Sequence, residues 1–318
     1  MTKHHHLSSS PATCHWGFFD AALKPVLTVQ SGDTVTVDCI SGGADVLPDA
    51  PFEVLPEHRA VLAKLTPAFG GGHILTGPIA VEGAEPGDTL EIRIHSIDCR
   101  QNWGWTRIAP LRGTLPEDFP ERRTWHTAMD RQRGVATTPW GQEVPLAPFF
   151  GVMGVAPRPV YGAVTTIVPR EFGGNLDLKE LTAGSTLYLP IWAKGALFSV
   201  GDGHGVQGDG EVCLTALETA LSGTFELVLR KDLRLDMPRA ETPTHWISLG
   251  LDEDLDDAAK QAVRQMIKLL GEIAGLAPAE AYMLCSLAVD FHVTQLVDGN
   301  KGIHGMLAKN LLSATSRK

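Results

Sequence analysis

The sequence predicts a mainly β protein, with an antiparallel β-sandwich or jelly-roll-like core and a C-terminal α+β subdomain. Glycine (33 residues) and proline (21 residues) are frequent in this chain of 318 residues, above their average shares of about 7% and about 5%, which indicates many turns. One turn-strand unit occurs three times, and helical patterns stand out in the last third. We therefore expect an N-terminal arm (1–20), a β-rich sandwich domain (21–250) and an α+β subdomain (251–318).

Short strands are predicted after three glycine turns, at residues 31–33, 86–88 and 183–185. In each case apolar and polar residues then alternate, over Thr34–Asp38, Thr89–Ile94 and Thr186–Ile191. Such alternation is typical of a half-buried strand. The spacing of the three units is too irregular for a solenoid, whose period would be fixed, and it favours a sandwich of antiparallel sheets.

The first ten residues contain His4, His5 and His6, followed by three serines. A polar start of this kind is a mobile arm or a remnant of a purification sequence. The competing interpretation is an arm that folds over a site.

The middle of the chain has a weaker pattern. Residues 100–148 are rich in Pro, Arg and Trp, which predicts long loops with short strands. Trp103 and Trp105 either wall a pocket or pack against a partner subunit. The apolar segment 148–157, which contains Gly151 and Gly154, is expected to be packed tightly near another backbone.

Two helices and a strand are predicted in the last third. Asp256 and Asp257 precede apolar residues at helical spacing, and this amphipathic pattern ends near Gly275. A second helix, starting at Pro278, is apolar nearly all round and is expected to be buried. Residues 290–297 then resemble a strand.

The formal net charge of −10 and the isoelectric point near 5.6 argue against nucleic acid or an anionic membrane as main partner, since both need clustered Lys and Arg. No apolar run approaches the ~18 residues of a membrane span, and residues 1–10 lack the apolar segment of a secretory signal. The cytoplasm is the expected compartment. The five cysteines are widely spaced without a Cys-x-x-Cys pair, so we expect free thiols.

Chemistry is concentrated in residues 201–211, GDGHGVQGDGE. The glycines let a ligand approach the main chain, and Asp202, His204, Asp209 and Glu211 supply oxygen and imidazole ligands. If the flanks are extended, Asp202 and His204 share one face and form a two-ligand clip for a divalent ion. A hairpin tip is the alternative, because Gly and Asp are common in turns. The histidine favours zinc, while calcium is the second candidate, although an EF-hand pattern is absent.

This loop, with its continuation to Glu218, resembles the signature of the acetamidase/formamidase family of amide hydrolases. Four further segments resemble the same family and occur in the same order as in that family, at residues 75–90, 148–157, 173–177 and 289–304. The resemblance implies hydrolysis of a small aliphatic amide, such as formamide or acetamide, to ammonia and a carboxylate. It also implies a tight pocket and a homo-oligomer.

Metal-assisted amide hydrolysis needs an ion with about three protein ligands and one open position, and a group that carries a proton to the leaving nitrogen. Glu218 is the favoured base, because a strand over 212–220 would place its carboxylate in an apolar row and because the resemblance includes a Glu there. Glu211 is the competing base. The expected metal ligands are Asp177, Asp202, His204 and His73, and the expected substrate-binding residues are Gln207, Asn175 and Gly174.

Other amidase mechanisms find no support in the sequence. It has no Gly-x-Ser-x-Gly elbow, and Cys213, two residues from Glu211, is expected to be a buried structural thiol. The alternative from a different class is a non-catalytic β-sandwich binding protein with a calcium-stiffened loop.

Overall fold

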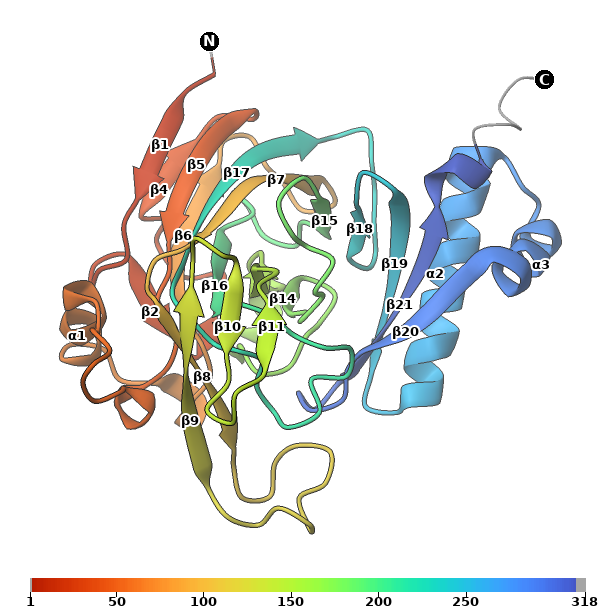
Figure 1. Ribbon diagram of the computed structural model, residues 1–318. Coiled ribbons are helices and arrows are strands. Elements are labelled where there is room, and N and C mark those ends of the chain that lie inside the picture. Colours follow the sequence, from red (N-terminus) through yellow and green to blue (C-terminus); the bar gives the residue numbers. More distant parts are fainter. Residues whose placement is uncertain (1, 313–318) are drawn as a thin grey trace.

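The computed structural model describes residues 2–312 and shows a mainly β protein (Figure 1), as predicted. The largest sheet has nine strands, in the spatial order β1 (His4–Leu7), β5 (Asp33–Asp38), β17 (Leu221–Arg230), β7 (Thr89–Cys99), β15 (Thr186–Pro190), β18 (Arg239–Glu241), β19 (His245–Asp252), β21 (Lys301–Ala308) and β20 (Val289–Gln295). Of these pairs, β1 and β5 are parallel.

A six-stranded sheet carries the site. Its order is β14 (Gly173–Asn175), β12 (Phe149–Gly154), β16 (Phe198–His204), β6 (Ile74–Val81) and β2 (Cys14–Trp16), with β4 (Leu27–Val29) paired in parallel with β6. A four-stranded sheet has the order β11 (Glu143–Pro145), β10 (Val135–Thr137), β9 (Arg123–Asp130) and β8 (Trp103–Ile108), and β3 (Phe18–Phe19) pairs with β13 (Val164–Thr165).

The main core lies between the nine-stranded and six-stranded sheets. Phe225 of β17 contacts Phe150 of β12 and Phe198 of β16, with ring centroids 5.6 and 5.9 Å apart. Burial of each such side chain contributes about 1.5–3 kcal/mol. This packing fixes the position of β16, whose last residue is His204.

All three predicted turn-strand units are strands of the nine-stranded sheet: β5, β7 and β15. β7 and β15 pair directly, whereas β17 lies between β5 and β7. The prediction is confirmed at the level of elements, and β7 continues five residues beyond Ile94, to Cys99.

The interpretation of the N-terminus as a mobile arm is wrong. Residues 4–7 form β1, in register with Thr34–Val37 of β5. His5 Nε2 lies 3.1 Å from Asp33 Oδ2, and His6 Nε2 lies 2.9 Å from Asp38 Oδ2. His5 and His6 therefore bind carboxylates of the neighbouring strand, and the backbone of residues 4–7 forms the edge of the sheet.

Residues 100–148 contain more strand than expected. β8 and β9 pair from Trp103↔Ala128 to Ile108↔Arg123, and the intervening residues 109–122 form a long loop. Trp103 is fully buried in a small core cluster, whereas Trp105 lines a cavity. The strand signal was weak because polar side chains on this hairpin interrupt the alternation.

The C-terminal α+β prediction is confirmed, with three differences. β19, β20 and β21 continue the nine-stranded sheet, so a boundary at residue 250 cuts through β19. The N-cap of α2 (Leu255–Ala274) is Asp254, whose side chain accepts hydrogen bonds from the backbone N–H groups of Asp256 and Asp257. Gly275 ends the helix with φ 66°, as expected.

The third difference concerns α3 (Pro278–Ala288), which was expected to be buried. Only one side of it packs, and the apolar side chains of Tyr282, Met283 and Leu287 are 62%, 60% and 84% exposed. A helix with apolar residues all round, covered on one side only, leaves an apolar face open.

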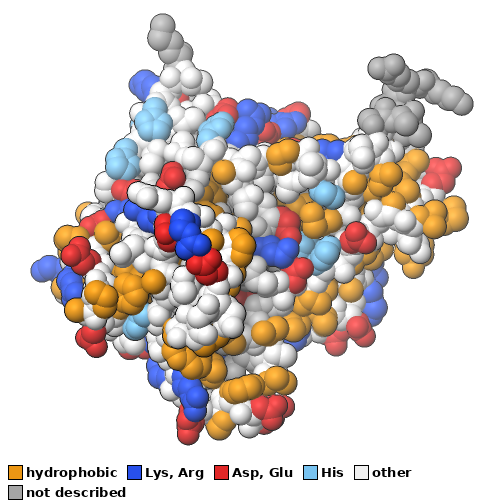
Figure 2. All heavy atoms as spheres, viewed as in Figure 1, with side chains coloured by type: hydrophobic (Ala, Val, Ile, Leu, Met, Phe, Trp, Pro, Cys, Tyr) orange, Lys and Arg blue, Asp and Glu red, His pale blue; other side chains and the backbone are white. Residues whose placement is uncertain are grey.

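The remaining elements are short. Helix α1 spans Pro56–Leu62, and 3-10 helices span Ala44–Val46, Ala68–Gly70, Pro159–Tyr161 and Lys309–Leu311. Within residues 2–312, the helices lack the combination of length and apolar character needed to cross a membrane. All five cysteines are free, as predicted. On the face shown in Figure 2, acidic and basic side chains of the described residues are interspersed.

Candidate active site

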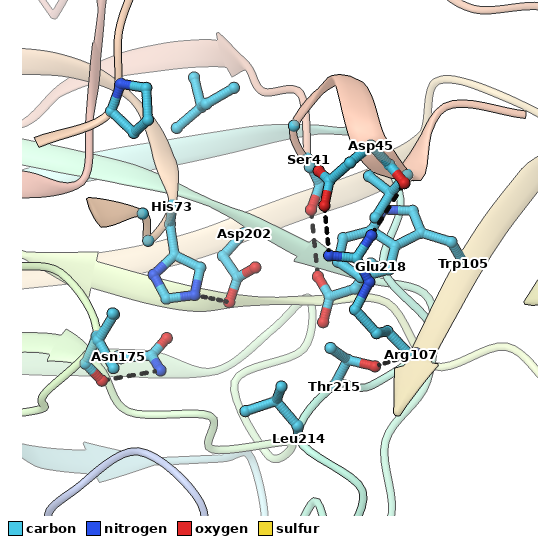
Figure 3. Close-up of a pocket in the computed structure, with 18 of the residues that line it drawn as sticks. Ser41, Asp45, His73, Trp105, Arg107, Asn175, Asp202, Leu214, Thr215 and Glu218 are labelled. Atoms are coloured by element: carbon cyan, nitrogen blue, oxygen red, sulfur yellow. Dashed lines mark hydrogen bonds and ion pairs between the residues drawn. The ribbon is translucent and has the colours of Figure 1, made fainter. Parts of the chain in front are cut away.

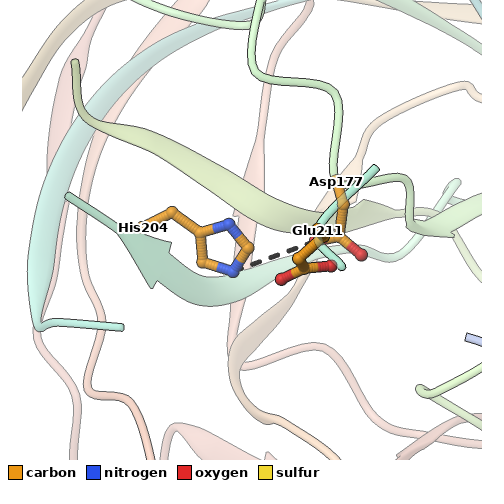
Figure 4. A group of neighbouring side chains, drawn as sticks. All are labelled: Asp177, His204 and Glu211. Atoms are coloured by element: carbon orange, nitrogen blue, oxygen red, sulfur yellow. Dashed lines mark ion pairs between the residues drawn. The ribbon is translucent and has the colours of Figure 1, made fainter. Parts of the chain in front are cut away.

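His204 is the centre of a buried group of carboxylates (Figure 4). Its Nε2 lies 3.1 Å from Oδ2 of Asp202 and 3.2 Å from Oε1 of Glu218. Oδ1 of Asp177 is 3.8 Å away. Asp177, His204 and Glu211 form one set with ligand atoms within 4.8 Å of one another, and Asp202, His204 and Glu218 form a second. Three chain segments therefore meet at one imidazole.

The strand β16 places Asp202 and His204 on the same side, as extended flanks would. The loop is not a hairpin tip, because β16 pairs with β12 and β6 along its length and the chain returns to β17 only after residue 220. Asp177 follows β14, which pairs with β12 on the other side. The sheet order β14-β12-β16 thus brings the two motifs together across one intervening strand.

Gly151 of β12 makes room for the cluster. A Cβ atom at this position would lie 2.4 Å from Oδ1 of Asp177, 2.5 Å from Oδ2 of Asp202 and 2.7 Å from Cε1 of His204. Such distances are shorter than van der Waals contact, so only glycine fits beneath the three side chains.

Three of the acidic residues have left-handed backbone conformations: φ is 48° at Asp177, 58° at Asp202 and 44° at Glu211. Non-glycine residues rarely adopt this conformation because it costs free energy, and the residues that do adopt it are concentrated at functional sites. The surrounding sheet holds each carboxylate in a position that a relaxed backbone would not give it.

Gln207 orients the imidazole. The Nδ1 atom of His204 lies 2.9 Å from Oε1 of Gln207, and the Gln207 amide donates to the backbone oxygen of Asp177. Because Gln207 Oε1 can only accept, Nδ1 carries a proton, and loss of the second ring proton would leave Nε2 free to bind a cation. Gln207 was expected to bind substrate, but it is absent from the residues that line the main cavity.

Burial shifts the pKa values of the cluster. Burial, with the charge of Asp202, raises the pKa of Glu218 to about 8. Burial, reinforced by Asp177, raises the pKa of Glu211 well above its usual range. For Asp202 burial acts in the same direction, but the charges of His73 and His204 outweigh it and lower the pKa. Burial lowers the pKa of His204, yet Glu218 and Asp202 raise it well above the usual value.

The cluster forms one wall of an open cavity of about 600 Å³ (Figure 3). His73 lies in the wall with its Nε2 3.7 Å from Oδ2 of Asp202. Asn175 also lines the cavity and has an unpaired, buried Oδ1. Gly174, expected to bind substrate, instead lies near the rings of Phe19 and Phe172. The cavity is larger than the tight pocket that the sequence resemblance implied.

Glu218 is buried, although the expected strand over 212–220 does not form. The segment makes only isolated bridges, in which Glu218 pairs with Trp105 and His204. The carboxylate accepts hydrogen bonds from Ser41 Oγ and the backbone N–H of Ala216, both at 3.2 Å. Turns with a positive φ at Glu211 and at Leu214 replace the strand.

Sequence reasoning missed Ser41, Asp298 and Gly151. Asp298 is buried in the turn between β20 and β21 and lines the cavity beside Asp177. Burial and the charges of Asp177 and Glu211 raise its pKa well above the usual range. Its Asp298-Gly299 turn lies within the segment 289–304, so the family-like motif was the one available signal.

Cys213 is half-exposed, and its thiol lies near the backbone oxygen of Thr215. The expectation of a buried thiol is wrong for this residue. Cys213 does not line the cavity that holds Glu218.

A second group of charged side chains links the C-terminal hairpin to the site loops, with His304 buried, Glu180 partly buried and Asp209 exposed. Glu180, Asp209 and His304 come together, and Lys179 Nζ lies 2.7 Å from Glu180 and 3.3 Å from Asp209. Burial would raise the pKa of Glu180, but His304 and Lys179 lower it to about 2. Lys179 supplies positive charge to this network, which connects the loop after Asp177 with the loop before Glu211.

Gly151→Ala is expected to displace the cluster, because the new methyl group overlaps three site atoms. We expect a loss of about 1–3 kcal/mol in unfolding free energy and a loss of most turnover. Chemical denaturation and ammonia release measure the two effects. Gly208→Ala, where a Cβ meets nothing within 4 Å, is the control, and equal behaviour of both variants would contradict the role of Gly151.

The fold and the cluster define a mainly β enzyme with acid–base groups at the base of an open cavity. The chain matches the model of the acetamidase/formamidase family over residues 6–161 and 160–307. It therefore belongs to the acetamidase/formamidase family, which confirms the prediction of an enzyme that hydrolyses small amides.

Similar proteins support this membership. A formamidase of Methylophilus methylotrophus is 26% identical over 352 residues, covering 87% of this chain and 84% of that protein. An acetamidase of Mycolicibacterium smegmatis is 31% identical over 234 residues, covering 55% of this chain and 56% of that protein.

Among solved structures, an acetamidase from Bacillus halodurans has a TM-score of 0.84 at 31% identity and covers 98% of this chain and 99% of that one. A predicted acetamidase/formamidase from Thermoanaerobacter tengcongensis has a TM-score of 0.86 at 25% identity and covers both chains fully, at 100%.

Proposed function

We propose that the protein hydrolyses formamide, acetamide and related aliphatic amides with the help of a divalent metal ion held at His204. Zinc is the leading candidate and calcium the second. The observation that carries the proposal is the arrangement of three carboxylates around Nε2 of a buried imidazole. Imidazole with carboxylates is a ligand set that suits zinc and similar metals.

The residues fit a cation for an electrostatic reason. Both carboxylate oxygens of Asp177 are buried without a hydrogen-bond partner, and a buried carboxylate is costly unless hydrogen bonds or opposite charges compensate it. Five carboxyl groups line this region, and His204 and His73 are the imidazoles beside them; the five are Asp177, Asp202, Glu211, Glu218 and Asp298. Asp177, Asp202 and His204 would hold the ion, with His73 beside Asp202.

A divalent ion, when bound, polarises a carbonyl group and lowers the pKa of a bound water. The Glu218 carboxylate, which lines the cavity, would accept the proton of the water that attacks the amide carbon. The same carboxyl would then give that proton to the nitrogen as the carbon–nitrogen bond breaks, which releases ammonia and leaves the carboxylate product. Ser41 holds Oε2 of Glu218 in place.

Glu218 is favoured over Glu211 as this base because of its neighbours. The Glu218 carboxylate accepts two hydrogen bonds, which fix its orientation. Burial raises the pKa of Glu218 to about 8, close to the value that suits proton transfer near neutral pH. The Glu211 carboxylate lies close to Asp177 and His204, and this position suits a further ligand to the metal ion.

Ammonia release from formamide, acetamide and propionamide tests the proposal. Because the cavity exceeds the size of these amides, we expect kcat/KM values within about tenfold of one another, below the discrimination that a closely fitted pocket gives per methylene. A strong preference for aromatic amides would contradict the substrate class. Inactivity on all amides would favour the non-catalytic binding protein, against which family membership argues.

We further propose a cytoplasmic homo-oligomer. Five free thiols suit a reducing compartment. The open apolar face of α3 supports self-association, since monomers rarely expose contiguous apolar surface. The mass in solution, measured by light scattering, tests the oligomer directly.

A further inference from the structure

The cavity has a cationic rim as well as an acidic base. Three arginines line it, Arg107, Arg112 and Arg122, together with a single aspartate, Asp45. Figure 3 shows Asp45 and Arg107 on the side of the cavity near Glu218, and His73 and Asn175 on the other. The rim therefore carries more positive than negative charge.

The rim arginines differ in what they already bind. Arg107 is largely buried and donates to Asp45, to the Asp45 backbone oxygen and to Thr124. Arg122 shares the same Asp45 carboxylate. One aspartate thus neutralises only one of two guanidinium groups.

Arg112 has no such partner. It is exposed, lines the cavity, and its guanidinium makes no hydrogen bond or ion pair among residues 2–312. The loop that carries it is attached to the segment that follows Glu211, because Thr114 N donates to the backbone oxygen of Val212 at 2.9 Å. A free guanidinium beside a cavity is suited to bind a carboxylate.

The spacing connects this rim to the reacting position. Trp105 and Glu218 exchange backbone hydrogen bonds at 2.9 and 2.8 Å. Arg107 is two residues beyond Trp105 on β8, so their Cα atoms are about 7 Å apart. The guanidinium carbon of Arg107 lies 5.5 Å from the Trp105 ring centroid. In a five-carbon dicarboxylic monoamide the two carbonyl carbons are about 5 Å apart when extended, and a molecule of this length fits within the cavity that Glu218 and Arg112 both line.

We propose that the cavity accepts amides that bear a carboxylate, with the amide at the acidic base and the carboxylate at the arginine rim. The cavity of about 600 Å³ is of the size that holds a ligand much larger than acetamide. Arg112 is the specificity-determining residue. This inference rests on the proposed function, because it concerns the same site.

The test compares glutaramate with 5-methylhexanamide, in which two methyl groups replace the carboxylate oxygens. For the metal-loaded enzyme we expect kcat/KM for glutaramate to exceed that for 5-methylhexanamide by about tenfold or more, the size of one charge-assisted hydrogen bond. Raising the salt concentration should lower this ratio, because the rim is exposed to solvent.

Substitutions locate the effect. Arg112→Gln should lower the glutaramate to 5-methylhexanamide ratio by about threefold or more, whereas Arg112→Lys should retain most of it. Arg123→Gln is the matched control, since Arg123 is exposed, pairs with Glu121 and does not line the cavity. Equal ratios in wild type and Arg112→Gln would overturn the role of Arg112.

Acetamide separates this inference from the proposed function. If the wild-type enzyme hydrolyses acetamide but its ratio of kcat/KM for glutaramate to kcat/KM for 5-methylhexanamide is near one, only the carboxylate preference is overturned. Inactivity on acetamide and on both longer amides would overturn the proposed function and this inference with it.

Discussion

Glu218→Gln is expected to lower kcat by a factor of about 10² to 10⁴, the usual contribution of a general acid or base. Glutamine keeps the shape of the side chain and its hydrogen bond with Ser41, so the fold and the bound metal should remain. The physical reason for the loss is that a neutral amide cannot accept the proton of the attacking water. Steady-state ammonia release and metal analysis of the same preparation measure both parts.

Glu211→Gln is the matched comparison, because Glu211 is the other buried glutamate of the cavity. If Glu211 is a ligand, its variant should lose metal and activity together. Near-normal kcat with ordinary metal content in Glu218→Gln would return Glu218 to a structural role and pass the base role to Glu211.

His204→Ala is expected to remove the metal and reduce kcat far more than stability, since the imidazole is the group that the carboxylates share. A loss of one ligand from a site of about three should weaken metal binding by at least tenfold. Metal content after dialysis, kcat and the unfolding midpoint are the three measurements.

His95→Ala is the control for this variant. His95 lies on β7, with its side chain 49% exposed and paired with Glu226. It should keep metal and activity. Unchanged kcat in His204→Ala would move the site elsewhere in the molecule.

The fold could be predicted where local patterns decide it. Alternation after glycine turns gave β5, β7 and β15, and helical spacing with Gly275 gave the end of α2. The sheet order could not be predicted, because pairing such as β7 with β17 joins residues far apart in the chain. Burial of α3 was predicted wrongly, since periodicity reports which faces are apolar and not which faces are covered.

The site could be predicted in part. Asp202 and His204 share a face of one strand, which spacing alone suggests, and Asp177 entered through its resemblance to a family motif. Gly151, Ser41 and Asp298 are far from the 201–211 loop in sequence. The sheet order brings Gly151 beside His204, Ser41 contacts Glu218, and the β20–β21 turn brings Asp298 into the cavity. The sequence marks only the close packing at Gly151 and the family-like segment around Asp298, and neither signal gives the position in the site.

Some predicted roles changed for geometric reasons. Gln207 lies near His204 in sequence, but its amide bridges His204 to the Asp177 backbone and does not line the main cavity. The left-handed backbone at Glu211 redirects the chain, so Glu218 is buried without the strand that was expected to bury it.

We propose that amide hydrolysis by this protein requires a metal ion at His204. The most direct measurement is ammonia release from acetamide before chelation, after chelation and after stepwise return of zinc or calcium, with metal content determined at each step. We expect that activity disappears with the metal and returns as about one equivalent of zinc per chain is restored. Full activity in a demonstrably metal-free preparation would contradict it.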